Sequence, residues 1–252
     1  MQSDQGARGA DAASLLSAAL DAHGGLERWN AARALRAHAS IGGTMWGRKG
    51  HPSFLSDVWI DLDPHRQWVS YTPFGAPDHR SVFEPDHNAI ERLDGTVVEQ
   101  RRDPIAAFAR HGPETLWDEL NVAYFSGYAI WNYLTTPFLL TLPGVHVERT
   151  DPWRENGETW LRLEACFPDT IATHNRRQTF YFDSQDGLLR RHDYNADVFG
   201  GVATANYAQA PKTFDGLVFP TQRRVVPRTP DNTTASEPIL VSIDLSAIYV
   251  ES

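Results

Sequence analysis

The sequence predicts a mainly β (α+β) fold: a single curled antiparallel sheet, or half-barrel, with an N-terminal helix and a central helical insertion packed across it. Three observations support this prediction. From residue 35 onward, most of the chain alternates apolar and polar residues, which is the period of a half-buried strand. The helical period is found only near the N-terminus and between residues 103 and 143. An open flat sheet of so many strands would expose its edges and apolar faces, so the sheet must curl.

The N-terminal region predicts two helices. Apolar residues recur at helical spacing in Asp11–Ala22, and Gly24 and Gly25 follow, as expected where a helix ends. A short second helix is expected at Leu26–Ala34. Residues 1–10 are small and polar and predict a flexible tail, and they lack the basic and apolar regions of a signal peptide.

The strands are expected on both sides of the insertion, and we take the whole chain, residues 1–252, as one domain. Asp94-Gly95 is a strong hairpin signal between two of them. In sequence order the predicted strands are 35–41, 54–62, 67–71, 80–83, 89–93, 96–100, 145–149, 159–167, 173–182, 188–199, 204–209, 217–219, 223–226 and 239–248.

The helical insertion at 103–143 is marked by the helix breakers Asp103-Pro104 and Gly112-Pro113. Helices are expected at 105–110 and 114–134. Because the second of these is apolar nearly all round, we expect it to be buried against the sheet.

Composition excludes several partners. The chain has 23 basic and 32 acidic residues among its 252, and the net charge of −9 disfavours nucleic acid and anionic membranes. The longest apolar stretch, residues 122–142, is interrupted by Asn132 and Pro137, so no membrane span is predicted. The single Cys166 can form neither an internal disulfide nor a thiolate metal site. With no evident leader and one cysteine, the sequence predicts a cytoplasmic protein; it does not predict an oligomeric state.

The order of elements resembles the lipoprotein-carrier superfamily, whose members fold as an unclosed β-barrel wrapped over helices. The hairpin Phe180-Tyr181-Phe182-Asp183…Gly187-Leu188-Leu189-Arg190 is similar to theirs, because an aromatic strand ends in Asp and Gly-Leu restarts the chain. The stretch 23–29, HGGLERW, resembles the opening of a set of uncharacterised bacterial proteins. The resemblance implies carriers for the most part, with one enzyme of pigment biosynthesis among them.

The best-defined candidate site lies on the hairpin of residues 173–199. If residues 183–187 form a five-residue loop, His192 faces Gln178 and Arg177 faces Asp193, which suggests a cross-strand ion pair. Alternation then places one set of side chains on one face: His174, Arg176, Gln178, Phe180, Phe182, His192 and Tyr194. His192 would be the acid/base, His174 or Tyr194 its counterpart, and Arg176 and Gln178 would orient an anion. The alternative is that this face is only the solvated side of the sheet.

A second candidate is a polar stripe on the long helix. Asp118, Asn121, Tyr128 and Asn132, together with Phe125, follow helical spacing. The stripe could aim Asp118, Tyr128 and Asn132, with the neighbouring Trp131, at a ligand, or it could be the solvent face of the helix.

No motif points to a metal, a nucleophile or a cofactor. His79, Glu84, Asp86 and His87 lie close in sequence, and His174 with His192 could add nitrogen ligands, but nothing matches a known zinc spacing. No G-x-S-x-G elbow and no glycine-rich phosphate loop is present.

Three functional hypotheses remain. The leading one is a cofactor-independent acid/base enzyme, a lyase, isomerase, cyclase or hydrolase, acting on a hydrophobic or aromatic small molecule bound in the half-barrel. The alternative is a non-catalytic carrier of a lipid-like apolar ligand, and the third is a metal-dependent hydrolase.

Overall fold

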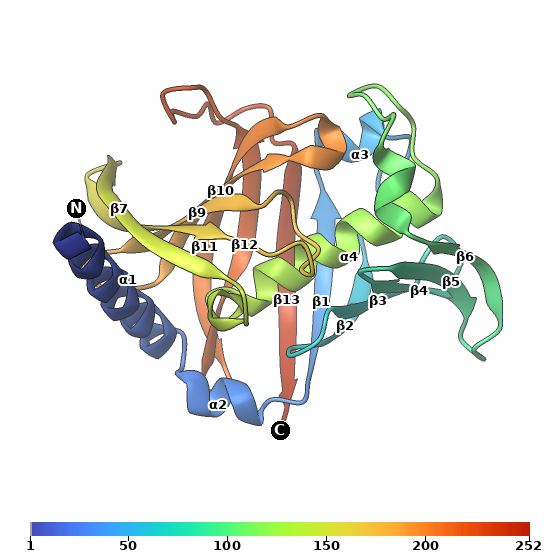
Figure 1. The fold of residues 1–252 in the computed structure, drawn as a ribbon. Helices are drawn as coiled ribbons and strands as arrows, with labels where there is room; N and C mark the ends of the chain where they lie inside the picture. The colour runs from blue at the N-terminus through green and yellow to red at the C-terminus, as the bar shows by residue number, and fades with distance from the viewer. Residues whose placement is uncertain (1) are drawn as a thin grey trace.

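The structure is a computed structural model that describes the backbone of residues 2–252 and the side chains of residues 11–252. A flexible tail was predicted at residues 1–10. Residue 1 lies outside the described residues, and so do the side chains of residues 2–10. Helix α1 (Gln2–Ala22) is followed by α2 (Leu26–Ala31), and both flank the sheet in Figure 1.

The sheet has thirteen antiparallel strands within the described chain, in the order β6-β5-β4-β3-β2-β1-β13-β12-β11-β10-β9-β8-β7. Two meanders, each of consecutive strands, meet where β1 pairs with β13. The first meander comprises β1 (Ala34–Gly42), β2 (Val58–Asp63), β3 (Trp68–Thr72), β4 (His79–Glu84), β5 (His87–Arg92) and β6 (Val97–Arg102). The second comprises β7 (His146–Glu155), β8 (Glu158–Cys166), β9 (Arg177–Asp183), β10 (Leu189–Ala196), β11 (Val202–Phe214), β12 (Leu217–Pro227) and β13 (Val241–Glu251). The predicted single, curled, mainly β fold is confirmed.

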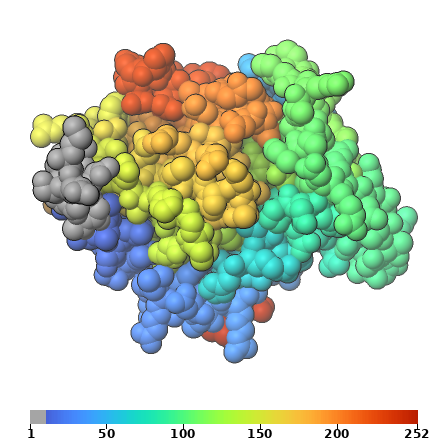
Figure 2. Space-filling model, in the orientation of Figure 1, coloured from blue at the N-terminus to red at the C-terminus, as the bar shows by residue number. Residues whose placement is uncertain are grey.

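The two edge strands, β6 and β7, are joined by the segment that carries the helical insertion. This segment contains η1 (Pro104–Phe108), α4 (Glu119–Thr135) and η2 (Phe138–Thr141). Helix α4 therefore runs across the open side of the sheet instead of extending either meander (Figure 1). In the space-filling view, segments coloured green to orange cover the interior, and β13 is largely hidden from this side (Figure 2).

Helix α4 is the centre of the core, as its apolar sequence predicts: every residue from Leu120 to Thr135 is buried. Gly127 lets the helix approach the sheet closely, because a Cβ atom there would lie 2.4 Å from the Cγ atom of Phe83 on β4. The strand pattern is equally clear in β1, where Leu35, Ala37 and Ala39 point into the core and alternate with more exposed residues.

Some boundaries differ from the prediction. Helix α4 begins at Glu119 instead of residue 114, because Asp118 caps it by accepting a hydrogen bond from the Asn121 backbone N–H at 2.8 Å. Strand β12 is continuous through the two short strands predicted there. A short helix, α3 (Thr44–Arg48), and η3 (Asp197–Phe199) were not predicted, since each is too short to show a helical period.

Candidate functional site

The predicted hairpin forms, but its register differs from the prediction by two residues. His192 faces Phe180 and Asp193 faces Thr179, and the register shifts between Leu189 and Arg191. The predicted pairing of His192 with Gln178 and of Asp193 with Arg177 is therefore wrong. Since side chains alternate with a period of two, a shift of two residues leaves the same side chains on the same face.

Two of the predicted residues, His174 and Tyr194, form a buried cluster with Tyr133 of α4. The Tyr133 hydroxyl lies 2.9 Å from His174 Nε2 and 2.6 Å from the Tyr194 hydroxyl. The His174 and Tyr194 rings are stacked, with centroids 3.6 Å apart. Burial lowers the pKa of His174 to about 3 and raises the pKa of Tyr194 to about 12. Both groups are therefore neutral at pH 7.

His192 lies beside this cluster with a separate partner. Its Nε2 atom lies 2.5 Å from Gln178 Oε1, and its ring stacks on Phe180 with centroids 4.2 Å apart. Because the Gln178 amide nitrogen donates to the Thr173 hydroxyl and the Asn175 carbonyl, its oxygen is the acceptor and His192 Nε2 carries the proton. Burial holds the pKa of His192 well below its ordinary value, with smaller contributions from His174 and Arg223.

Arg176 does not join these residues. Its side chain is exposed and pairs with Asp169 at 3.0 Å. Asp193 forms an ion pair, but its partner is not the predicted Arg177. It pairs with the fully buried Arg191 of its own strand, with Arg191 Nε 2.7 Å from Asp193 Oδ1. Phe182, the remaining residue of the predicted face, is part of the hydrophobic core.

Arg223 on β12 supplies a cation that the sequence did not reveal. It is buried, its Nη2 atom donates to the Tyr133 carbonyl at 2.8 Å, and its guanidinium lies 4.8 Å from the centre of the Tyr133 ring. That carbonyl would ordinarily accept from the N–H of residue 137, which is a proline and has none. Arg223 thus completes the C-terminal end of α4, and burial lowers its pKa to about 10.

The polar stripe of α4 is not a solvent face, because its residues within the helix are buried. Asp118 lies at its N-terminus and pairs with Arg101 at 2.7 Å. Tyr128 is buried, and its hydroxyl has no hydrogen-bond partner among the described residues. Trp131 donates from Nε1 to the Asp63 carbonyl at 2.8 Å, and Asn132 donates to the Tyr128 and Ala172 carbonyls. The stripe mainly fastens the helix to its surroundings.

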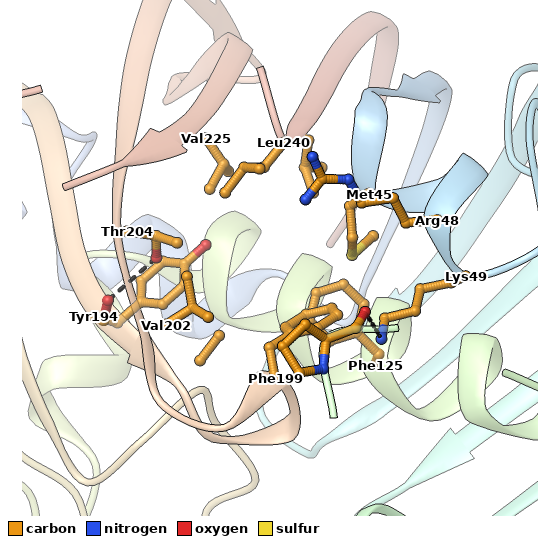
Figure 3. A pocket seen from close by; sticks show the side chains of 13 residues that line it. Met45, Arg48, Lys49, Phe125, Tyr194, Phe199, Val202, Thr204, Val225 and Leu240 are labelled. Atoms are coloured by element: carbon orange, nitrogen blue, oxygen red, sulfur yellow. Dashed lines mark hydrogen bonds between the residues drawn. The ribbon is translucent and has the colours of Figure 1, made fainter. Parts of the chain in front are cut away.

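An apolar pocket opens at the end of the half-barrel where α3 lies (Figure 3). Its cavity volume is about 100 Å³, and the space out to and including its open mouth is about 620 Å³. Its wall comes from β10 to β13, and α4 and α3 contribute the opposite side. The lining residues are Met45, Arg48, Lys49, Pro113, Phe125, Tyr194, Ala196, Phe199, Val202, Thr204, Val225, Leu240 and Val241.

Lys49 fixes one rim of this pocket. Its ammonium group is buried and donates to the carbonyls of Gly112, Pro113 and Thr115 at 3.1, 2.8 and 3.1 Å. It also lies 5.0 Å from the centre of the Phe199 ring. Burial lowers the pKa of Lys49. The segment before α4 is therefore held against α3.

Tyr194 of the predicted hairpin site lines the pocket, as does Phe125 of the α4 stripe. His174 and His192 lie behind this wall and bind other protein groups. Sequence reasoning missed the rest of the lining because α3 and the strand ends around it come together only through the β1–β13 pairing. One signal was available: Arg48-Lys49 is a pair of basic residues in an acidic chain.

The described residues contain neither a membrane-spanning helix nor a cluster of metal ligands. No helix in that part of the chain is long and apolar enough to cross a membrane. No group of three or more His, Cys, Asp or Glu side chains there is arranged to hold a metal ion.

Comparison with solved structures identifies the fold. No family model and no curated protein matches the chain. A LolA superfamily protein from Nitrosomonas europaea aligns with a TM-score of 0.54 and 10% identity, covering 96% of this chain and 94% of its own. A DUF1329 family protein from Desulfovibrio piger aligns with a TM-score of 0.44 and 12% identity over 95% and 93% of the two chains. A domain of a putative outer-membrane lipoprotein-sorting protein from Vibrio parahaemolyticus aligns with a TM-score of 0.49 and 9% identity over 90% of each.

These findings correct two predictions. The leading prediction, an acid/base enzyme, is contradicted, since the fold is the one that the LolA superfamily protein has. The geometry gives the physical reason, since the two histidines face protein groups and not the pocket. The cytoplasmic location is contradicted as well: it depended only on the single cysteine and the N-terminal composition, whereas the fold is the one that the LolA superfamily protein has. The chain has an unclosed-sheet fold similar to that of the LolA superfamily protein.

Proposed function

We propose that the protein is a non-catalytic carrier, or binding protein, for a lipid-like apolar ligand that occupies the pocket between α3, α4 and β10 to β13. The observation that carries the proposal is the pocket itself. Its lining is mostly apolar, as is usual for small-molecule sites, and its interior has a cavity volume of about 100 Å³.

The fold supports the same proposal. An unclosed sheet with a helix across its opening leaves an interior that is reached from one end. The LolA superfamily protein has this arrangement over nearly its whole length. A shared fold does not by itself set a function, so the argument depends on the pocket.

Filling the pocket should abolish binding. Ala196 lines the wall on β10 and is 3% exposed, so a phenylalanine there would occupy the ligand space. We expect Ala196→Phe to weaken binding of the neutral apolar probe N-phenyl-1-naphthylamine by at least about tenfold, equivalent to roughly 1.4 kcal/mol. The measurement is a fluorescence titration of the purified protein with this probe.

Ala203→Phe is the matched control. Ala203 pairs with Asn195 on the adjacent strand but lies between the lining residues Val202 and Thr204, so its side chain points to the opposite face of the sheet. The control should bind the probe as the wild type does. Absence of saturable binding to the wild type, or equal binding to the wild type and Ala196→Phe, would contradict the proposed function.

A further inference from the structure

The charges around the pocket are opposite in sign to those of the chain as a whole. The chain has nine more acidic than basic residues, yet the thirteen described residues that line the pocket include two basic side chains and no acidic one. A ligand entering this pocket therefore meets a local positive charge within an acidic molecule, and such a field favours an anion.

The two basic residues are not equivalent. The ammonium group of Lys49 is occupied by three backbone carbonyls and stabilises the rim. Arg48, the last residue of α3, is exposed, and no hydrogen bond or ion pair of its side chain is found among the described residues. In Figure 3 its guanidinium extends from α3 toward Leu240, over the cavity. Arg48 is thus the one lining cation whose donors are available to a ligand.

We propose that the ligand is a single-chain amphiphile whose anionic head group, a carboxylate or phosphate, is bound by Arg48 at the mouth while its chain lies in the apolar interior. This inference rests on the proposed function and adds the chemical class of the ligand. A guanidinium presents paired N–H donors that match the oxygens of a carboxylate or phosphate. Beside an apolar wall such a charge-assisted pair is screened less than one in open solvent.

The size of the pocket supports one chain over several. The interior has a cavity volume of about 100 Å³, which a lipid with two or three long acyl chains would greatly exceed. The polar end is placed at the mouth because the wall deeper inside consists of side chains such as Phe125, Val225 and Val241.

The test compares three probes that share a twelve-carbon chain: dodecanoate, dodecyl phosphate and the neutral dodecan-1-ol. Affinities are measured at pH 7.5 and low salt by displacement of N-phenyl-1-naphthylamine, for the wild type, Arg48→Gln and Arg102→Gln. Arg102 is exposed on the edge strand β6 and does not line the pocket, so its variant controls for net charge.

We expect the wild type to bind at least one of the anions about tenfold more tightly than the alcohol. Arg48→Gln should remove that preference and leave the affinity for the alcohol unchanged, while Arg102→Gln should retain it. Preference for dodecanoate assigns a carboxylate head group, and preference for dodecyl phosphate assigns a phosphate. If all three probes bind equally and Arg48→Gln changes none of them, the inference is overturned while the carrier function stands. If no probe binds the wild type, the proposed function fails as well.

Discussion

Lowering the pH from 7 to 5 is expected to reduce the free energy of unfolding by several kcal/mol. His23, His174 and His192 are each buried, and burial lowers the pKa of His23 to about 4, that of His174 to about 3 and that of His192 well below its ordinary value. In the unfolded chain these imidazoles take up protons near pH 6.5, whereas in the folded protein they stay neutral. Stability is therefore fully present above pH 6.5 and is lost as the pH falls below it. Each group contributes about 1.4 kcal/mol per pH unit, so three give roughly 4 kcal/mol per unit.

The pH prediction is checked by urea unfolding at several pH values. His174→Phe should retain the stacked position beside Tyr194 and flatten the slope between pH 6.5 and 5 by about 1.4 kcal/mol per unit. His146→Gln, at an exposed position on β7, should leave the slope unchanged. A wild-type stability that is constant over this range would contradict the assignment of neutral, buried imidazoles.

Removing the buried carboxylate of Asp193 is expected to have the largest effect of any single substitution considered. Asp193 accepts from Nε and Nη2 of Arg191 at 2.7 and 2.9 Å, and from the Tyr181 hydroxyl at 2.7 Å. Arg191 is completely buried. After Asp193→Ala, the nearest carboxylate to the Arg191 guanidinium is that of Glu155, whose Oε2 atom lies 2.8 Å from Arg191 Nη1. Breaking a buried ion pair costs about 3–5 kcal/mol, and we expect about 3 kcal/mol because Glu155 remains.

The matched control for Asp193 is Glu164→Ala. Glu164 also pairs with an arginine, but this partner, Arg177 on the neighbouring strand, is mostly exposed. Water screens such a pair, so the loss of stability should be much smaller. Equal losses for the two variants, measured as free energies of unfolding in urea, would show that burial does not set the strength of the Asp193 pair.

The fold was predictable because its signals are local. The alternation in β1 and the uniformly apolar α4 depend only on neighbouring residues, and they predicted a curled sheet crossed by a buried helix. The register of the β9–β10 hairpin was not predictable in the same way. It depends on an irregularity between Leu189 and Arg191, which no spacing in the sequence shows.

The site was harder to predict because its parts are far apart in the sequence. The imidazoles and phenol of residues 173–194 lie close together in the sequence and suggested acid/base chemistry. In the structure most of that polarity is used internally, and α4 supplies the decisive partner, Tyr133. The pocket instead combines α3 with β10 to β13, since the Thr44 and Met45 N–H groups donate to the Ile239 and Leu240 carbonyls. Only the pairing of the first and last strands brings these segments together.

Native mass spectrometry of gently purified protein tests the central claim, that the pocket holds one lipid-like molecule, most directly. The wild type is expected to carry, or to acquire on incubation with dodecanoate, one bound amphiphile per chain. Ala196→Phe should show only the mass of the chain itself, and Ala203→Phe should behave as the wild type. A wild type that remains without a ligand under these conditions, or an Ala196→Phe variant that binds equally well, would contradict the account.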